Sequence, residues 1–355
     1  MAWSPIHYHW RWQLKSKPAQ LWPYVADTRR FNQAAALPAI DYSEIPLPLG
    51  GSQRIGRTSR WGIAVEFEDI PFDWVKEQSF SNVRLFKVGP LAKTVAKLTL
   101  RPNAEGTLLQ YDIEVTPANL LGVVGIPYQF GWVMRRSFGQ AFAQIDAYLQ
   151  NQAAKPFNLI AKPLIRPENV RLNNLVKQLS QQGYAPQWVQ HLVDLLSSEA
   201  DLNLIRLRPY VLADIWQAPR QTILEMFLSA AKLSLLNMRW DVMCPLCRGA
   251  KTTALSLDEV RKGVHCPTCN IDFEADFTKN VELTFTPHPQ IRTVDDFEYC
   301  IGGPMITPHI LAHQTLPPGE IRSVQLQTKA RGFRFRTQQP GVEAWFSLPD
   351  PTPPR

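Results

Sequence analysis

The chain has 355 residues, of which 45% are hydrophobic and 19% are charged, and its formal net charge is +7 with an isoelectric point near 9.2. This length exceeds one compact domain, and the composition excludes wholesale disorder. The basic residues form no dense Lys/Arg block, so the charge favours a solvated basic surface over one that attracts nucleic acid or anionic lipid.

The N-terminal stretch from Met1 to Trp12 contains His7, His9 and Arg11 and no apolar core run, so we expect no signal peptide. Runs of about 18 apolar residues are absent from the sequence, which argues against a membrane span. Five cysteines, an odd number, without an export signal indicate a reducing compartment. We therefore expect a cytoplasmic protein.

Residues 1–150 have the pattern of an antiparallel sheet that is followed by a helix. An alternating, aromatic-rich stretch at 7–14 predicts a strand, and Pro18 near the start of the next segment predicts a helix. Further strands are predicted at 40–45, 52–61, 63–71, 73–79, 82–87, 93–101 and 106–115. Apolar residues at three- and four-residue steps then predict a long helix from Pro127 to Leu149, which would cover the apolar face of the sheet.

This order of elements, and above all the stretch LWPYVADTRRFN from Leu21 to Asn32, resembles the helix-grip fold of START-like domains, the polyketide-cyclase and lipid-transport class. The resemblance implies a cavity between the sheet and the long helix. Its candidate lining residues are Trp61, Val65, Phe67, Trp74, Phe86, Leu98, Tyr111, Trp132 and Phe138. Side chains with this spacing more often pack as an ordinary core, so that alternative stays open.

Residues 151–239 are predicted to be a helical linker. Helices are expected at 170–182, 186–197, 208–216 and 219–236, and the last two have helix-turn-helix length and spacing. A small bundle between two domains is favoured over DNA recognition. The reason is that the last helix, with Thr222, Glu225 and Lys232, has too few cations to neutralise many phosphates.

Residues 240–279 contain two C-x-x-C pairs, Cys244 with Cys247 and Cys266 with Cys269, which 18 residues separate. This spacing is typical of a zinc ribbon, because each pair holds two thiolates on a tight turn and two such turns complete a tetrahedral site. A closed site of four cysteines has no position for a substrate, so we predict a structural Zn²⁺. A redox dithiol or a pair of disulfides fits the two pairs and the reducing compartment less well.

Residues 280–348 show short alternating stretches between turn signals and predict a small β-sandwich, and the tail 349–355 is Pro-rich and linker-like. Cys300 is expected to be a buried, small apolar residue. The sequence contains neither a nucleophile elbow nor a Gly-rich phosphate loop, so no catalytic residues are assigned. The predicted fold class is therefore α+β, with a helix-grip domain, a helical linker, a zinc ribbon and a β-sandwich.

Across residues 1–348, the order of these modules resembles the N-terminal region of bacterial multidomain class III adenylate/guanylate cyclases. The segments LLNMRWDVMCPLCRG at 235–249 and YCIGGP at 299–304 carry this resemblance, with Thr307-Pro308-His309 and Pro318-Gly319-Glu320. It implies a regulatory part of a signalling protein that would act on a cyclase catalytic domain in cis or in trans. The chain itself lacks the metal-binding carboxylates of such a catalytic domain.

The hypothesis is therefore a non-catalytic regulatory module that senses an apolar small molecule and holds a structural zinc ion. Two alternatives stay open. One is a nucleic-acid-binding zinc-ribbon protein, suggested by the basic charge and the pair of helices. The other is an enzyme of the polyketide-cyclase type, for which Glu66, Asp69 and Tyr111 are the polar candidates.

Overall fold

The computed structural model describes residues 3–47, 52–260, 262–266, 269–300, 302–326, 328, 331–337 and 342–347. The chain divides into two compact units. The first comprises Met1–Asn158, Cys266–Ile271 and Glu298–Arg355, and the second comprises Leu159–His265 and Asp272–Phe297. The Pro-rich tail 349–355 lies outside the described residues. No described helix is both long and apolar enough to cross a membrane.

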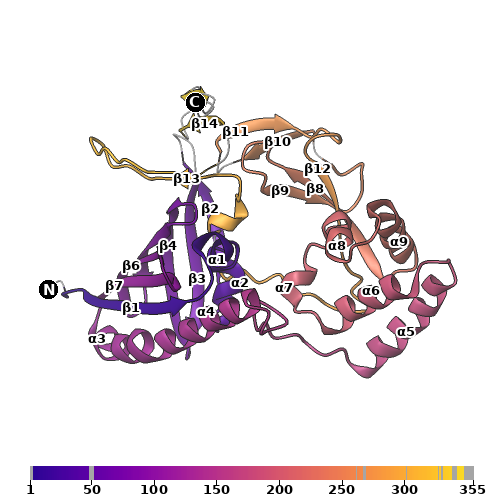
Figure 1. The fold of residues 1–355 in the computed structure, drawn as a ribbon, viewed down its shortest axis with the longest axis horizontal. Helices are drawn as coiled ribbons and strands as arrows, with labels where there is room; N and C mark the ends of the chain where they lie inside the picture. The colour runs from indigo at the N-terminus through magenta and orange to yellow at the C-terminus, as the bar shows by residue number, and fades with distance from the viewer. Residues whose placement is uncertain are drawn as a thin grey trace. The chain divides into compact units, whose positions relative to one another are not determined.

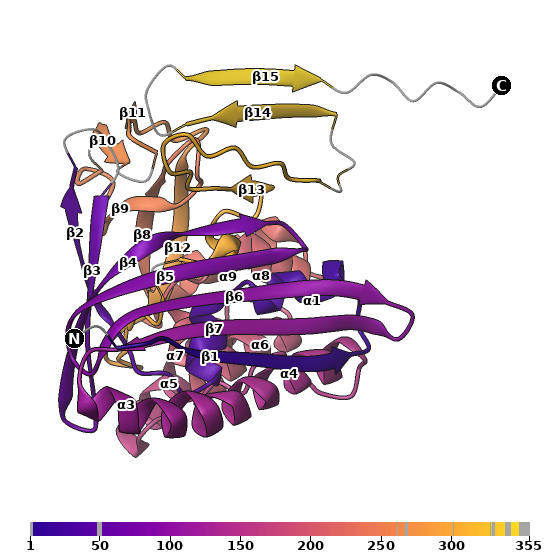
Figure 2. The ribbon, with the colours of Figure 1, turned by 90° about the vertical axis from the view of Figure 1, so that its left-hand side faces the viewer.

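The first unit is built on an antiparallel sheet in the order β1-β7-β6-β5-β4-β3-β2. Its strands are β1 (Ile6–Leu14), β2 (Asp41–Pro46), β3 (Ser52–Arg60), β4 (Ile63–Val75), β5 (Ser79–Val88), β6 (Leu91–Asn103) and β7 (Gly106–Pro117), and Figure 2 shows them side by side. In β7, residues 107, 109, 111, 113 and 115 are buried and their neighbours are only partly buried. This period of two creates one apolar face that another layer must cover.

Helices cover that face. Two short ones, α1 (Pro18–Val25) and α2 (Thr28–Ala34), follow β1, and a long helical segment follows β7. The long segment consists of α3 (Leu120–Ile126), the π-helix η1 (Pro127–Met134) and α4 (Arg135–Leu149), and it runs along the sheet (Figures 1 and 2). The helix predicted at 127–149 is therefore present and extends further toward the N-terminus.

The contacts of α4 explain why it packs on the sheet. Phe138 meets Trp10 of β1 and Tyr111 of β7 edge-on, with ring centroids 6.1 and 5.4 Å apart. Near the other end of α4, the carboxylate of Asp146 accepts hydrogen bonds from the backbone N–H and the hydroxyl of Ser16, at 2.9 and 2.6 Å. Aromatic packing and the hydrogen bonds of Asp146 thus hold α4 against β1 and the residues that follow it. The unit therefore has the helix-grip arrangement, in which a long C-terminal helix packs on a large antiparallel sheet.

The β-sandwich predicted at 280–348 is wrong for the described residues, because its strands belong to three different sheets. The first, β12 (Val281–Pro287), pairs with β8 (Leu236–Met243) in the second unit. The next, β13 (Ala312–His313), pairs with β4 at Trp74 and Val75, beyond the residues of β4 that pair with β3. The last two, β14 (Gly332–Arg336) and β15 (Glu343–Ser347), form a separate hairpin. Periodicity predicts that a strand forms, but an open strand edge elsewhere in the chain decides its partner.

The segment 298–315 thus returns to the first unit as a strap. Backbone hydrogen bonding joins Glu298 to Ile40, and the amide of Asn32 donates to the carbonyl of Tyr299 at 2.9 Å. At the far end of the strap, the ring of His313 stacks on Trp74 with centroids 4.7 Å apart. Residues that were expected to lie within a separate β-sandwich therefore belong to the helix-grip unit.

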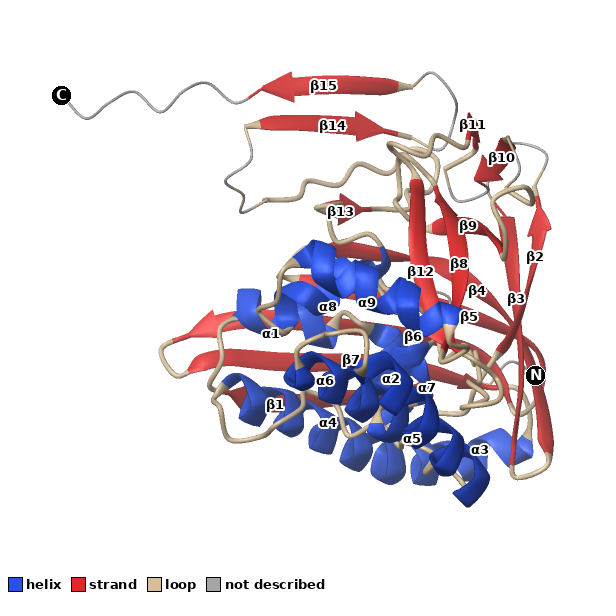
Figure 3. Ribbon diagram, turned by 90° about the vertical axis from the view of Figure 1, so that its right-hand side faces the viewer, coloured by secondary structure: helices blue, strands red, loops and turns tan. Residues whose placement is uncertain are grey.

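The second unit packs five helices and a three-stranded sheet around one core (Figure 3). The helices are α5 (Arg166–Ser180), α6 (Pro186–Ser198), α7 (Asp201–Leu204), α8 (Pro209–Ile215) and α9 (Arg220–Lys232). The sheet has the order β12-β8-β9, where β9 is Ala250–Ala254. Phe227 of α9 meets Phe285 of β12 with centroids 5.3 Å apart. The helix predicted to reach residue 236 ends at Lys232, because Leu236 begins β8. The helices also share their core with the sheet, so they do not form the separate linker that was predicted.

Candidate functional site

Four cysteines gather at the ends of short strands. Cys244 directly follows β8, and Cys247 lies in the turn before β9. Cys266 is the last residue of β10 (Gly263–Cys266), and Cys269 precedes β11 (Ile271–Glu274), the partner of β10. All four side chains are buried, and their sulfur atoms lie within 4.8 Å of one another. The two pairs that the sequence separates by 18 residues therefore meet at one point.

The two pairs share one backbone feature, although their hydrogen bonds differ in register. The backbone N–H of Arg248 donates to the carbonyl of Cys244, four residues earlier, at 2.9 Å, and that of Cys269 donates to the carbonyl of Cys266, three residues earlier, at 3.2 Å. The residue after the second cysteine is left-handed in each case, with φ of 59° at Arg248 and 48° at Asn270. Non-glycine residues rarely adopt this conformation, so its repetition indicates a constraint that both turns share.

The cluster fits a tetrahedral metal ion. A Zn–S distance of about 2.3 Å and tetrahedral angles place neighbouring sulfur atoms about 3.8 Å apart, within the observed limit of 4.8 Å. His265 is not part of the cluster, since its Nδ1 lies 2.9 Å from the Asp272 carboxylate on the surface. Four sulfur ligands suit zinc or iron, and a closed set of four favours a structural role. The described residues can therefore hold a metal ion here.

The nine candidate pocket residues do not form one lining. Phe67, Trp74, Leu98, Tyr111 and Phe138 are buried, and Val65 and Phe86 are partly buried. Trp61 and Trp132 instead lie on the surface, 68% and 58% exposed. Trp61 occupies the tip of the β3–β4 hairpin with φ of 52°, and Trp132 lies on the outer side of η1. The expectation that these two tryptophans line an interior cavity is therefore wrong.

A buried polar cluster lies among the remaining candidates. The side chain of Asp69 on β4 is fully buried, and its Oδ2 accepts a hydrogen bond from the Tyr42 hydroxyl at 2.8 Å. The same oxygen lies 3.3 Å from Nη2 of Arg84, which is opposite Asp69 on β5. The guanidinium of Arg84 also stacks over Phe67, 4.6 Å from the ring centroid. One carboxylate oxygen thus has two partners.

The cluster also contains polar atoms without partners. Among the described residues, Asp69 Oδ1 and Arg84 Nε have no hydrogen-bond partner although both atoms are buried. Burial raises the pKa of the Cys300 thiol, and the nearby charge of Asp69 raises it further. Burial likewise raises the pKa of Tyr111. The buried Asp69–Arg84 pair therefore retains one acceptor atom and one donor atom that could form further hydrogen bonds.

Sequence reasoning found only part of this cluster. Asp69 and Tyr111 were named, but the third polar candidate, Glu66, is instead paired with Arg57 at 2.8 Å away from the cluster. Tyr42, Arg84 and Cys300 were missed. The available signal was strand alternation, which places Asp69 on the same face as the buried Phe67, where a charged residue is unusual. Cys300 could not be found in this way, because it reaches the sheet only through the strap.

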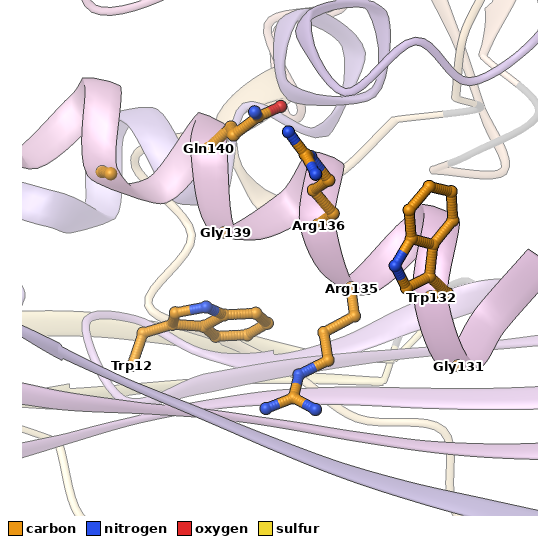
Figure 4. Close-up of a pocket in the computed structure, with 8 residues that line it drawn as sticks. Trp12, Gly131, Trp132, Arg135, Arg136, Gly139 and Gln140 are labelled. Carbon is orange, nitrogen blue, oxygen red and sulfur yellow. The ribbon is translucent and has the colours of Figure 1, made fainter.

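A second, open site lies on the outside of the first unit. It is a groove of about 500 Å³ beside η1 and α4, lined by Trp12, Trp132, Arg135 and Arg136, with Gln140 at one end (Figure 4). Trp12 forms the base of the groove next to Gly139 of α4. Because Gly139 has no side chain, the indole of Trp12 can approach the helix closely. It is a surface feature and does not reach the polar cluster.

Comparisons with known proteins give one family match and several similar solved structures. Residues 171–299 match the model of a family of unknown function, DUF5939. Comparison with curated proteins gives no match. A solved structure of an uncharacterised protein from Rhizobium leguminosarum is 14% identical and covers 41% of this chain and 97% of its own, with a TM-score of 0.31.

An aromatase/cyclase from Streptomyces sp. R1128 is 8% identical and covers 39% of this chain and 94% of its own, also with a TM-score of 0.31. Scores this low carry no argument about this chain. The assignment of the helix-grip arrangement therefore rests on the topology of the first unit itself.

Proposed function

We propose that this chain is a non-catalytic regulatory module, in which the helix-grip unit binds an apolar small molecule and the four cysteines hold a structural Zn²⁺ in a zinc ribbon. The observation that carries the ligand part is the unpartnered Oδ1 of the buried Asp69 carboxylate. A buried acceptor without a partner costs about 1–3 kcal/mol. A ligand that donates a hydrogen bond to this oxygen would recover that free energy.

The surroundings of Asp69 define the class of ligand. Phe67 packs against Arg84, and Leu98 and Phe138 belong to the same buried, largely aromatic interior of the unit. Asp69 Oδ1 accepts and Arg84 Nε donates, so the complementary ligand is an apolar molecule with one hydroxyl-like group that can both donate and accept. Burial of the remaining apolar surface would supply most of the affinity.

A role without catalysis follows from how the polar residues are used. Asp69 is held by Tyr42 and Arg84, and burial, together with the charge of Asp69, raises the pKa of Tyr42 while Arg84 opposes this shift. A tyrosine with a raised pKa is a poor proton donor at neutral pH, so this set favours binding over acid–base chemistry and disfavours the polyketide-cyclase alternative.

The signalling part of the proposal rests on the resemblance in module order to the N-terminal region of class III cyclases. A cyclase catalytic domain, in cis or in trans, is the proposed partner, and the cytoplasm is the proposed compartment because zinc-binding thiolates must stay reduced. The nucleic-acid alternative gains no support from α9. Its Arg220 is paired with Asp214 at 2.7 Å, and Lys232 is the one other cation within its bounds.

The test is to extract the purified 355-residue protein under denaturing conditions and to identify the released small molecules by mass spectrometry. The wild type should yield a bound apolar compound, and Asp69→Asn should retain roughly tenfold less of it, since it loses a charge-assisted hydrogen bond. Glu66→Gln, on the same strand but paired with Arg57, is the matched control and should retain it fully. Equal retention in both variants, no compound in the wild type, or cyclic nucleotide formation from ATP or GTP with Mg²⁺ or Mn²⁺ would each contradict the proposal.

A further inference from the structure

An exposed row of large apolar residues runs along the outside of α3 and η1. Leu120, Leu121, Val124, Tyr128 and Trp132 are each between 55% and 77% exposed. Trp61 from the β3–β4 hairpin joins them, with its ring centroid 6.4 Å from that of Tyr128. Tyr128 in turn stacks on Trp132 at 5.9 Å. We call these six residues the apolar stripe. Single exposed apolar residues are ordinary, but a contiguous group marks an interaction surface.

The helix geometry keeps the stripe straight. Leu120, Val124, Tyr128 and Trp132 follow one another at four-residue steps. In an α-helix, each such step turns about 40° past a full revolution, so a row of this kind drifts around the helix. The π-helix at 127–134 places more residues in each turn and offsets that drift. An eight-residue π-helix is rare, and here it aligns Tyr128 and Trp132 with the residues of α3.

The charged residues in the chain segment that carries most of the stripe have one sign. No acidic residue occurs between Glu114 and Asp146, a stretch that includes the whole stripe except Trp61. Arg135 and Arg136 lie three and four residues after Trp132, and Figure 4 shows their side chains leaving the helix in different directions. The guanidinium of Arg60 lies 5.0 Å from the ring centroid of Trp61. The stripe thus has an arginine at each of its aromatic ends.

We propose that the apolar stripe is a peripheral docking surface for an anionic lipid bilayer. Tryptophan and tyrosine favour the boundary between headgroups and acyl chains, and leucine and valine would enter the acyl region. The three arginines would reach anionic headgroups with their guanidinium groups while their stems stay among the apolar residues. The proposal is independent of the ligand in the helix-grip interior.

A second copy of the chain fits the stripe less well. Two copies that meet through the same surface would be related by a twofold axis, so the interface would contain Arg60, Arg135 and Arg136 of both copies. With no acidic residue between 114 and 146 to separate them, these like charges would repel. An anionic bilayer supplies the opposite charge and has no such conflict.

The experiment is co-sedimentation of the full chain with vesicles of phosphatidylcholine alone and of phosphatidylcholine with an equal part of phosphatidylglycerol. We expect binding to the second kind, and its loss at high salt. Leu121→Asn with Val124→Asn should weaken binding about tenfold or more, and Arg135→Gln with Arg136→Gln about fivefold per charge. Ile160→Asn is the matched control, because Ile160 is 84% exposed but belongs to the other unit.

Each outcome decides the matter. Binding that the stripe variants reduce and Ile160→Asn does not would support the proposal. No sedimentation with either vesicle, equal binding to both, or full binding by the Leu121/Val124 variant would overturn it. Light scattering on the same samples tests whether a second copy of the chain occupies the stripe instead. If the protein forms a dimer that Val124→Asn dissociates, and it does not bind vesicles, the stripe is a dimer interface. Circular dichroism of each variant confirms that it is folded.

Discussion

Asp201 and Arg292 form an ion pair that is almost shielded from water in the second unit. The side chain of Arg292 is 3% exposed, and its Nη2 lies 2.6 Å from Asp201 Oδ1. The guanidinium also donates to the carbonyl of Leu196 at 3.2 Å, and the backbone N–H of Asp295 donates to Asp201 Oδ2. Lys162 lies beside the same carboxylate. Removing one member of such a buried pair is strongly destabilising, because it leaves the other charge buried without compensation.

We therefore predict that Asp201→Asn lowers the free energy of unfolding of the second unit by about 2 kcal/mol. The pKa of Asp201 lies below its ordinary value of 3.8, because the hydrogen bonds and charges of Arg292 and Lys162 outweigh the opposing effect of burial. A carboxylate with a lowered folded-state pKa contributes stability above pH 3.8, which is lost as the pH falls through the folded pKa. Urea unfolding across pH 2–6 should show this acid-dependent loss in the wild type and a smaller one in the variant.

Asp214→Asn is the control for that experiment. Asp214 also has a lowered pKa, from hydrogen bonding to Arg220, but the pair is exposed and screened by solvent. Its replacement should leave the unfolding midpoint at neutral pH unchanged. If both variants unfold like the wild type, the Asp201–Arg292 pair does not stabilise the unit.

At the scale of elements, the packing of α4 against β1 depends on a close approach at one glycine. A Cβ atom at Gly139 would lie 2.8 Å from Nε1 of Trp12, closer than such contacts occur. Trp12 is itself held by Phe142, with ring centroids 5.1 Å apart, so it has little freedom to move away. Gly125 in α3 has open space at the same position. Two helical glycines thus have opposite surroundings.

This contrast predicts opposite effects of the same substitution. Gly139→Ala should lower the free energy of unfolding by about 1 kcal/mol, because the overpacking cost exceeds the gain in helix propensity. Gly125→Ala should raise it by about 0.5–1 kcal/mol, since propensity acts there without a clash. Thermal unfolding of the two variants in parallel is the measurement. A stabilised Gly139→Ala protein would mean that Trp12 yields without cost.

At the scale of the whole molecule, residues 159–297 lie between the two largest parts of the first unit, and within this stretch the short segment Cys266–Ile271 is also assigned to the first unit. The stretch is therefore an insertion between the long helix and the strap. The candidate metal centre lies within this inserted stretch, and small strands such as β10 and β11 bury too little apolar surface to be stable alone. Metal binding, worth about 10 kcal/mol in small zinc modules, would supply what they lack.

We predict that chelation unfolds the cysteine segment locally. Hydrogen exchange should rise in residues 236–287 after metal removal, while the strands from β1 to β7 keep their protection. Elemental analysis of the untagged protein should find one equivalent of zinc. Cys247→Ser should lose the metal and show the same exchange as the chelated protein, and Cys300→Ser, the cysteine outside the cluster, should retain it. Metal-free protein with full protection of this segment would contradict the prediction.

The sequence by itself determined the features that local chemistry sets. The spacing of Cys244, Cys247, Cys266 and Cys269 predicted a cluster because ligand geometry limits the turns that can hold two sulfurs. The alternation in β7 and the apolar steps of α4 predicted a sheet with a covering helix because side-chain direction follows from backbone conformation.

Only the tertiary structure decided which distant segments meet. That β13 joins β4, that Arg84 and Tyr42 share the Asp69 carboxylate, and that Trp61 and Trp132 face solvent all depend on contacts between residues far apart in the chain. A periodic pattern states which face of an element is apolar, but the burial of that face depends on which other surfaces compete for it.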